Sequence, residues 1–320
     1  MKETAMKCRI CGNEHNNEPI TLSERHLGLG DRFDYITCSN CGCMQIKDIP
    51  ANMDRYYPGN YYSFDAPVFP SRLTPLGARL KRSLINHCMG YADITGFLLS
   101  FIYPHPFPWI RKREITFTSS ILDVGAGAGR KSLSLHRSGF RNVLGIDPYI
   151  NSDIDYGNGV KILKKNLSEI NSGFDFIMLH HSFEHMPRPA ETVMHLDRLL
   201  NPGGIILIRI PVAGCRAWEL YGEYWYGLDA PRHFYIHSRR SIEILLENTN
   251  LKIDGVVFDS SAYQFVSSEK YLKGMTLLSP DEPLFTPADI QKYAAEAEKL
   301  NREGKGDTAC FYIRKKASAK

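Results

Sequence analysis

The sequence has little of what a membrane-spanning or nucleic-acid-binding protein requires. Among its 320 residues the longest apolar run, from about Ile94 to Tyr103, is roughly half as long as a bilayer-spanning helix, and Pro104, Pro106 and Pro108 end it. The net charge is only +4, without the basic stripe of a nucleic-acid surface, so nucleic acid is not a favoured partner. Because the first residues are polar, no secretory signal is expected and the predicted location is the cytoplasm.

The apolar run itself has two interpretations. A core or cap helix is favoured. The alternative is a peripheral contact with a membrane that carries a lipid-linked substrate, because basic residues at 79–82 precede the run.

Eight cysteines in a chain without an expected export signal indicate thiols or metal ligands rather than disulfides. Residues 1–50 contain two C-x-x-C-G pairs, and four thiolates at about 2.3 Å complete a closed tetrahedral zinc site. We therefore predict a zinc-binding module with a structural Zn²⁺. A redox pair and unpaired free thiols are the competing interpretations. The predicted ligands are Cys8, Cys11, Cys38 and Cys41, with Cys43 as the alternative to Cys41.

A cofactor-binding strand and loop are predicted at Ile121–Gly129, where an apolar strand runs into a glycine-rich turn. The loop follows Asp123 and has glycines at Gly125, Gly127 and Gly129. This spacing differs from the G-x-G-x-x-G that holds a pyrophosphate, so S-adenosylmethionine is favoured over a nicotinamide dinucleotide. A second strand then ends in Asp147, which can accept hydrogen bonds from both ribose hydroxyls of an adenosine.

Strands and helices alternate through the rest of this region. Strands are expected at 161–167, 174–181 and 205–210, with a helix from Pro189 to Leu200, and this order predicts a doubly wound parallel α/β sheet. In such a sheet, ligands bind beyond the carboxyl ends of the strands. Further strands are expected from Val256 and over Ala309–Ile313.

The runs ILDVGAGAGR, GID and FDFIMLHHSFEHMPRPAETVMHLDRLLNPGGIILIRIP resemble class I S-adenosylmethionine-dependent methyltransferases. That resemblance implies a seven-stranded Rossmann-like sheet with its last strand antiparallel. More narrowly, the chain resembles a bacterial subgroup found among cell-surface polysaccharide and sugar-modifying enzymes. The narrower likeness rests on the C-x-x-C-G pairs, RYYPGNYYSF at 55–64, DAPRHF at 229–234 and YQFVSSEKYLKG at 263–274.

The resemblance extends the predicted cofactor site. Where such enzymes often have an acid after strand three, this chain has Asn166, whose amide oxygen can still accept a hydrogen bond from the adenine amine. Leu167 next to it, His180 at the end of the fourth strand and Tyr62 in the tyrosine-rich segment are the remaining expected cofactor contacts.

The predicted domains are the module at 1–50, an aromatic linker and helical cap at 51–117, and the methyltransferase domain at 118–320. The tyrosine-rich part of the linker either packs on the core or closes over the cofactor. Within the last domain, residues 213–237 contain seven aromatic residues and are interpreted as a substrate lid whose rings stack on a sugar.

Methyl transfer from a sulfonium is an in-line displacement, so much of the rate comes from positioning. An alcohol, or a carbon beside a carbonyl, also needs a base, and histidine is suited to neutral pH. His185 and His233 are the favoured bases, and Arg232 is expected to hold an acidic or phosphorylated acceptor group. The structural alternatives are a Glu184–His185 pair that holds its own loop and a His233 bonded to a backbone carbonyl. The other candidates near the chemistry are Glu184, His180, His181 and His237.

The sequence thus predicts a methyltransferase acting on a sugar, nucleotide sugar or cell-surface glycan. An RNA or lipid-precursor methyltransferase, a nicotinamide-dependent sugar oxidoreductase and a non-catalytic scaffold are the alternatives. The oligomeric state and the methylated atom, whether oxygen, carbon or nitrogen, are left open.

Overall fold

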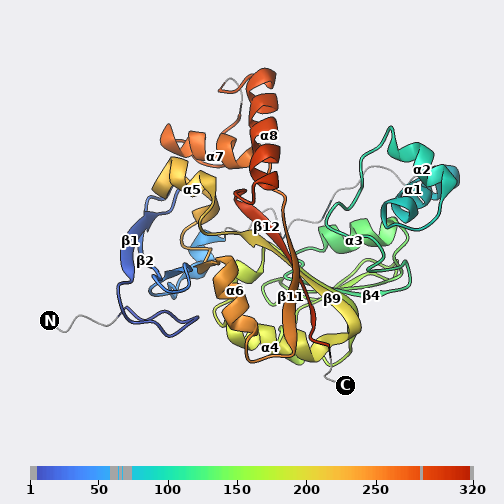
Figure 1. The fold of residues 1–320 in the computed structure, drawn as a ribbon, viewed down its shortest axis with the longest axis horizontal. Helices are drawn as coiled ribbons and strands as arrows, with labels where there is room; N and C mark the ends of the chain where they lie inside the picture. The colour runs from blue at the N-terminus through green and yellow to red at the C-terminus, as the bar shows by residue number, and fades with distance from the viewer. Residues whose placement is uncertain (1–5, 58–63, 65–66, 68–73, 282–283, 318–320) are drawn as a thin grey trace. The chain divides into compact units, whose positions relative to one another are not determined.

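The fold is an α/β sheet with a small second sheet, three strands of which come from the N-terminal part of the chain (Figure 1). The computed structural model describes residues 6–57, 64, 67, 74–281 and 284–317. Tyr61 and Tyr62, two of the four tyrosines at 55–64, lie outside the described residues.

The large sheet has eight strands in the order β11-β12-β9-β8-β4-β5-β7-β6. β4 pairs in parallel with β5 and β8, and β5 in parallel with β7, so the predicted mixed α/β sheet with parallel strands is confirmed. The bounds are β4 (Ser120–Val124), β5 (Asn142–Ile146), β6 (Ile154–Asp155), β7 (Lys161–Leu163), β8 (Phe174–His180), β9 (Leu200–Pro211), β11 (Leu251–Phe258) and β12 (Thr308–Lys315).

The strand count differs from the seven that the resemblance implied, because a further edge strand is present. β6 has two residues and pairs antiparallel with β7. Ile154 of β6 packs on a small apolar cluster with Leu133, Val160 and Ile162. A segment this short has no alternation from which a strand could be predicted. The last strand, β12, pairs antiparallel with β11.

In the part of the chain that the structure describes, helices lie between many of these strands in the sequence. Several begin at residues that favour a helix start: Thr74 accepts a hydrogen bond from Gly77 N at 3.1 Å before α1, and Ser238 does so from Ser241 N at 3.0 Å before α6. The bounds are α1 (Pro75–Cys88), α2 (Ile94–Ser100), α3 (Arg130–Arg137), α4 (Pro189–Leu199), α5 (Arg216–Tyr221), α6 (Arg239–Leu246), α7 (Tyr263–Leu272) and α8 (Pro287–Arg302). Among the described residues, no helix combines the length and apolar character needed to cross a membrane.

The small sheet has the order β1-β2-β3-β10. β1 (Glu18–Ser23), β2 (Arg32–Thr37) and β3 (Met44–Ile46) come from the N-terminal module, but β10 (Tyr235–Ile236) comes from the predicted lid. β10 pairs antiparallel with β3 through Tyr235 opposite Gln45 and Ile236 opposite Met44. The module therefore completes its sheet with a strand almost two hundred residues further along the chain.

The chain divides into two compact units whose bounds cut across the predicted domains. One contains Met1–Pro58, His180–Met194 and Ile208–Lys316, and the other contains Gly59–Leu179, His195–Leu207 and Ala317–Lys320. The cysteine module thus shares a unit with much of the predicted methyltransferase domain. The pairing of β3 with β10 and a shared apolar core are the physical reasons.

Candidate active site

The glycine loop after β4 adopts a backbone that requires glycine. Gly125, Gly127 and Gly129 have φ values of 74°, 53° and 79°, in the left-handed region. A Cβ atom at Gly129 would lie 2.5 Å from Cδ1 of Ile162, so a side chain does not fit there. Gly129 is also the N-cap of α3, which places backbone N–H groups of the loop and helix start at one end of β4.

Two aspartates hold this loop. Asp147, directly after β5, accepts hydrogen bonds from Gly127 N and Tyr149 N, both at 2.9 Å. Asp123, in β4, accepts one from Ser132 Oγ at 2.8 Å and is buried, and burial raises the pKa of its carboxyl to about 6. Asp123 therefore anchors the first turn of α3, while Asp147 joins the loop to the neighbouring strand.

Asn166 follows β7 and begins a short turn of helix. Its Nδ2 donates to Glu169 Oε2 at 3.2 Å, and its backbone N donates to the same oxygen at 2.7 Å. This arrangement is a capping box in which the Asn166 side chain also accepts from the backbone N of Glu169. The second lone pair of Oδ1 is the acceptor that the sequence predicts for an adenine amine. The neighbouring Leu167 is half-buried.

These residues fit an adenosine-bearing cofactor without a pyrophosphate. Because the loop has glycine at three positions, its backbone can lie close to a bound cofactor. The carboxyl ends of β4 and β5, where such a ligand binds, lie side by side in the sheet. Asp123, the three glycines, Asp147, Asn166 and Leu167 remain the predicted contacts. Tyr62, predicted with them, lies outside the described residues.

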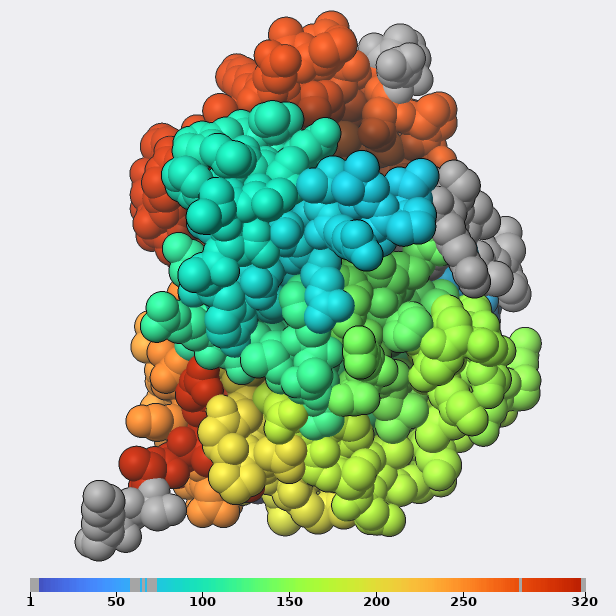
Figure 2. Space-filling view, turned by 90° about the vertical axis from the view of Figure 1, so that its right-hand side faces the viewer, coloured from blue at the N-terminus to red at the C-terminus, as the bar shows by residue number. Residues whose placement is uncertain are grey.

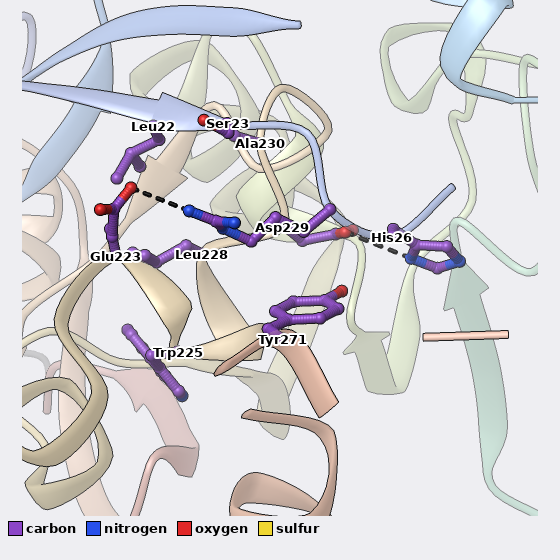
Figure 3. A pocket seen from close by; sticks show the side chains of 10 residues that line it. Leu22, Ser23, His26, Glu223, Trp225, Leu228, Asp229, Ala230 and Tyr271 are labelled. Carbon is purple, nitrogen blue, oxygen red and sulfur yellow. Dashed lines mark hydrogen bonds and ion pairs between the residues drawn. The ribbon is translucent and has the colours of Figure 1, made fainter. Parts of the chain in front are cut away.

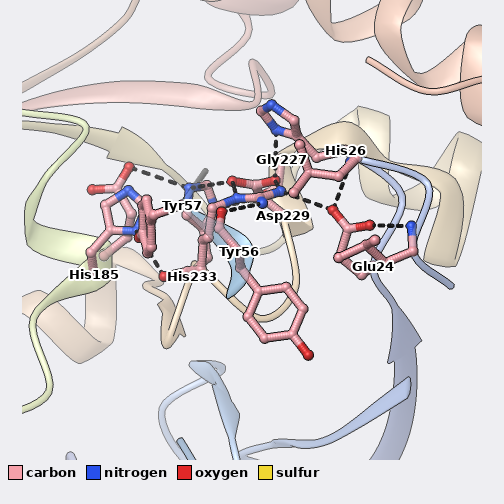
Figure 4. Close-up of polar contacts among 12 residues, drawn as sticks. Glu24, His26, Tyr56, Tyr57, His185, Gly227, Asp229 and His233 are labelled. Atoms are coloured by element: carbon pink, nitrogen blue, oxygen red, sulfur yellow. Dashed lines mark hydrogen bonds and ion pairs between the residues drawn. The ribbon is translucent and has the colours of Figure 1, made fainter. Parts of the chain in front are cut away.

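A second group of functional side chains lies in the unit that contains the cysteine module, and it gathers two histidines and a carboxylate (Figure 4). His185 Nδ1 lies 2.7 Å from Arg232 O, and His233 Nδ1 lies 2.8 Å from Gly227 O. Since a carbonyl oxygen only accepts, both Nδ1 atoms carry the proton, and Nε2 is the remaining proton site of each ring. The two rings contact edge to face, with centroids 4.8 Å apart.

The two rings differ in what surrounds them. His233 Nε2 lies 3.9 Å from Glu184 Oε1 and 3.8 Å from Asp229 Oδ2. His185 is half-buried, and burial together with the charge of His233 lowers its pKa, so the ring is neutral near pH 7. A neutral ring with a free Nε2 lone pair can accept a proton.

Glu184 is fully buried. Desolvation opposes its ionisation, but a polar contact with His181 and the nearby histidines outweigh it and lower the carboxyl pKa to about 2. His181 Nδ1 lies 3.4 Å from Glu184 Oε1, and its other nitrogen contacts Arg209. One ligand atom from each of Glu184, His185 and His233 lies within 4.8 Å of the others, so the group can also hold a metal ion.

Arg232 is not placed to hold an acidic or phosphorylated group of the methyl-accepting substrate, contrary to the sequence-based expectation. Its side chain is fully buried and donates to Asp229 Oδ2 at 2.9 Å, to Glu24 Oε1 at 3.3 Å and to Tyr56 O at 3.0 Å. His26 Nδ1 lies 3.3 Å from Asp229 Oδ1 on the same network. Arg232 thus links DAPRHF to the N-terminal module through buried hydrogen bonds to Asp229 and Glu24.

Two further histidine candidates are buried. His237 lies in the core, 3.1 Å from Ser241 Oγ and stacked on Tyr235. Its side chain is fully buried, so neither ring nitrogen is open to a methyl acceptor, and burial lowers its pKa to about 3. His180, predicted to touch the cofactor, is the buried last residue of β8.

Comparison with known proteins identifies the enzyme class. Residues 98–256 match a family model described as a methyltransferase domain. The chain carries a methyltransferase domain. The predicted enzyme class, an S-adenosylmethionine-dependent methyltransferase, is confirmed by this match. No curated protein matches the chain.

Solved structures that resemble the chain include other methyltransferases. A putative sarcosine dimethylglycine methyltransferase from Galdieria sulphuraria is 17% identical, with 62% of this chain and 79% of that chain covered and a TM-score of 0.39. An O-methyltransferase of a polyketide multienzyme from Brevibacillus brevis, in complex with S-adenosyl-L-homocysteine, is 15% identical, with 63% and 68% covered and a TM-score of 0.38. Sequence identities and TM-scores this low establish neither the substrate nor the reaction of this chain.

The predicted lid of the methyltransferase domain is largely a core element. Trp225, Phe234 and Tyr235 are buried against the cysteine module, and Trp225 Nε1 donates to Asp307 Oδ2 at 3.2 Å. These three rings are therefore not available to stack on a sugar, because they fill the module's core instead. The half-buried aromatic residues of the segment are Trp218, Tyr221, Tyr224 and Tyr226.

The four predicted cysteine ligands lie together. Cys8 Sγ is 3.7 Å from Cys41 Sγ, and Cys11 Sγ is 3.5 Å from Cys38 Sγ. Tetrahedral zinc with bonds of about 2.3 Å needs sulfurs about 3.8 Å apart, so the donor set and its spacing fit a closed site. The fifth cysteine, Cys43, lies outside this group.

Tyr57 is a neighbour of the histidines that the sequence did not single out. Its hydroxyl lies 3.3 Å from His185 Nδ1. The tyrosine-rich 55–64 segment was the only sequence signal, and it did not indicate which ring contacts the histidines.

A small cavity near the Arg232 network is lined by Leu22, His26, Asp229 and Tyr271 among others (Figure 3). At about 10 Å³ it has room for about one water, not a substrate.

Proposed function

We propose that this methyltransferase domain transfers a methyl group from S-adenosylmethionine to a sugar, nucleotide sugar or glycan, with His185 as the general base. The observation that carries the proposal is the hydrogen bond from His185 Nδ1 to Arg232 O, together with the lowered pKa of the ring. Bound S-adenosylmethionine supplies an electrophilic methyl group on a sulfonium. His185 Nε2 takes the proton of the acceptor.

The surrounding residues position this base. Arg232 O fixes the tautomer of His185, and the buried Arg232 side chain is fixed in turn by Asp229 and Glu24. Buried Glu184 stays ionised and favours a positive charge on the neighbouring rings once a proton arrives. His233 is the alternative base, but two carboxylates face its Nε2, which suits a role in this charge network better.

A sugar-type acceptor is supported by the two motifs that carry the narrower resemblance. DAPRHF supplies Arg232 and His233, and YQFVSSEKYLKG forms α7. Tyr226, three residues before DAPRHF, donates from its backbone N to Ser268 Oγ of α7 at 3.2 Å. We further propose that the cysteine group binds structural Zn²⁺ and that the enzyme works in the cytoplasm, where cysteines that form no disulfide, such as these eight, persist.

The first test is calorimetric titration of the full chain with S-adenosylhomocysteine and, separately, with NAD. Micromolar binding of S-adenosylhomocysteine alone is expected, followed by methyl transfer to a member of a nucleotide-sugar and glycan panel. His185→Gln should reduce turnover by about 100-fold or more while S-adenosylhomocysteine still binds. Methyl transfer only to RNA or a lipid precursor would replace the proposed acceptor, and NAD binding alone would overturn the cofactor.

A further inference from the structure

The helix pair α1–α2 packs through small residues. Asp93 caps α2 by accepting a hydrogen bond from Gly96 N at 2.8 Å. Gly96 is buried against α1, where an added Cβ would lie 2.0 Å from Ser83 O and 2.7 Å from the Cβ of His87. At this position α2 therefore meets α1 through a glycine, and the ring of Phe97 packs edge to face on His87 of α1 with centroids 5.5 Å apart. Most of the other large side chains of α2 are exposed.

Those large side chains form an apolar stripe that faces outward. Ile94, Phe97, Leu98 and Phe101 follow the i, i+3, i+4, i+7 spacing that normally faces a core. Here they are 82%, 47%, 60% and 73% exposed. The rings of Phe97 and Phe101 contact each other with centroids 5.0 Å apart. Ile102 and Tyr103 extend the stripe, and Figure 2 shows this teal part of the chain at the surface.

Cations lie on both sides of the stripe in the sequence. Residues 74–115 contain six arginines and lysines and two acids, so this segment alone accounts for a net charge equal to that of the whole chain. Arg113 N donates to Met89 O at 2.7 Å, which holds residues 111–113 beside the end of α1. The cations are Arg79, Lys81, Arg82, Arg111, Lys112 and Arg113, and four of them, Arg79, Arg82, Lys112 and Arg113, are exposed.

We propose that this stripe and its flanking cations bind the surface of an anionic lipid bilayer, with α2 lying in the plane of the membrane. An apolar helix face bordered by lysine and arginine is the chemistry that inserts beside anionic headgroups. A second copy of the chain would bring two sets of cations together, whereas anionic lipid neutralises them. The inference goes beyond the proposed methyl transfer and does not depend on it.

The test is sedimentation of the full chain with phosphatidylglycerol–phosphatidylcholine vesicles and with phosphatidylcholine alone. The expected result is binding to the anionic vesicles that weakens with salt. Phe101→Asp/Ile102→Asp should lower the partition coefficient by about tenfold or more, because two apolar side chains no longer insert. The matched control is Met194→Asp/Leu278→Asp, at two apolar residues outside the stripe that are almost as exposed; this variant should bind as the wild type does.

A second pair of variants tests the charge. Lys112→Glu/Arg113→Glu should weaken binding to anionic vesicles by about tenfold, whereas Lys252→Glu/Lys292→Glu, with the same charge change on exposed residues elsewhere, should weaken it much less. Cooperative thermal unfolding of every variant shows that it is folded. Equal binding to neutral vesicles, no vesicle binding, or a dimer that Phe101→Asp/Ile102→Asp dissociates would each overturn the proposal.

Discussion

Among single residues, the histidines show how identical side chains acquire different roles from their surroundings. His185 and His233 both donate from Nδ1 to a carbonyl, yet only His233 has two carboxylates facing Nε2. His237 is buried on Tyr235 and Ser241 and stays neutral. The environment of each ring, rather than its residue type, separates the proposed base from the proposed charge partner and from a core residue.

The pH dependence of methyl transfer tests the assignment of His185. Because the pKa of His185 is lowered by burial and by His233, the base is lost only when the pH falls below the ordinary histidine value of about 6.5. The acid limb of kcat against pH should therefore lie below pH 6.5. His15→Gln, at an exposed histidine, should leave that limb in place. A limb above pH 6.5 would contradict a neutral buried base.

The sequence could identify these residues but not their partners. His185 and His233 were predicted because they follow a strand end and occupy a motif. The burial of Arg232 was not predictable, because its partner Glu24 lies 208 residues away and only the folded chain brings them together. The same holds for Tyr57, whose contact with His185 spans 128 residues.

At the scale of motifs and structural elements, the cysteine pairs and the glycine loop were the easiest features to predict. Both depend on local spacing, and in the structure Cys8, Cys11, Cys38 and Cys41 lie together as that spacing requires. The lid was the hardest. Its aromatic content indicated ligand stacking, but three of its rings fill the core of the module instead. Composition alone does not distinguish a ring that packs on protein from one that packs on sugar.

Metal content distinguishes Cys41 from Cys43. Cys41 Sγ lies 3.7 Å from Cys8 Sγ, whereas Cys43 Sγ lies 3.5 Å from Met44 O and 4.0 Å from His237 Nδ1. Purified wild type should contain about one zinc per chain, by mass spectrometry of the metal. Cys43→Ser should keep that zinc, while Cys41→Ser should lose most of it and unfold the module. Equal zinc in both variants would contradict the four-cysteine site.

For the whole molecule, the module and the C-terminal part of the chain form one compact unit. The sequence predicted a separate domain at 1–50, because the cysteine pairs end there. The sequence did not indicate that β3 pairs with β10, or that Trp225 and Tyr235 are buried against the module.

Removal of the first 50 residues tests this dependence. A chain that starts at residue 51 should expose the apolar faces of Trp225, Phe234 and Tyr235 and lose cooperative thermal unfolding. The full chain, prepared in parallel, should unfold cooperatively and precipitate less. Calorimetry and dye binding to exposed apolar surface measure both effects. A truncated chain that melts as sharply as the full one would instead support an independent N-terminal domain.

The pairing of β3 with β10 also constrains how the protein is made. Met44 to Ile46 leave the ribosome long before Tyr235 and Ile236, which complete their sheet. At translation rates of roughly 5 to 20 residues per second, the free edge of β3 waits on the order of 10 to 40 seconds for its partner strand. A zinc ion captured early would hold the nascent module together during that interval, so metal supply during translation would govern the yield of folded enzyme.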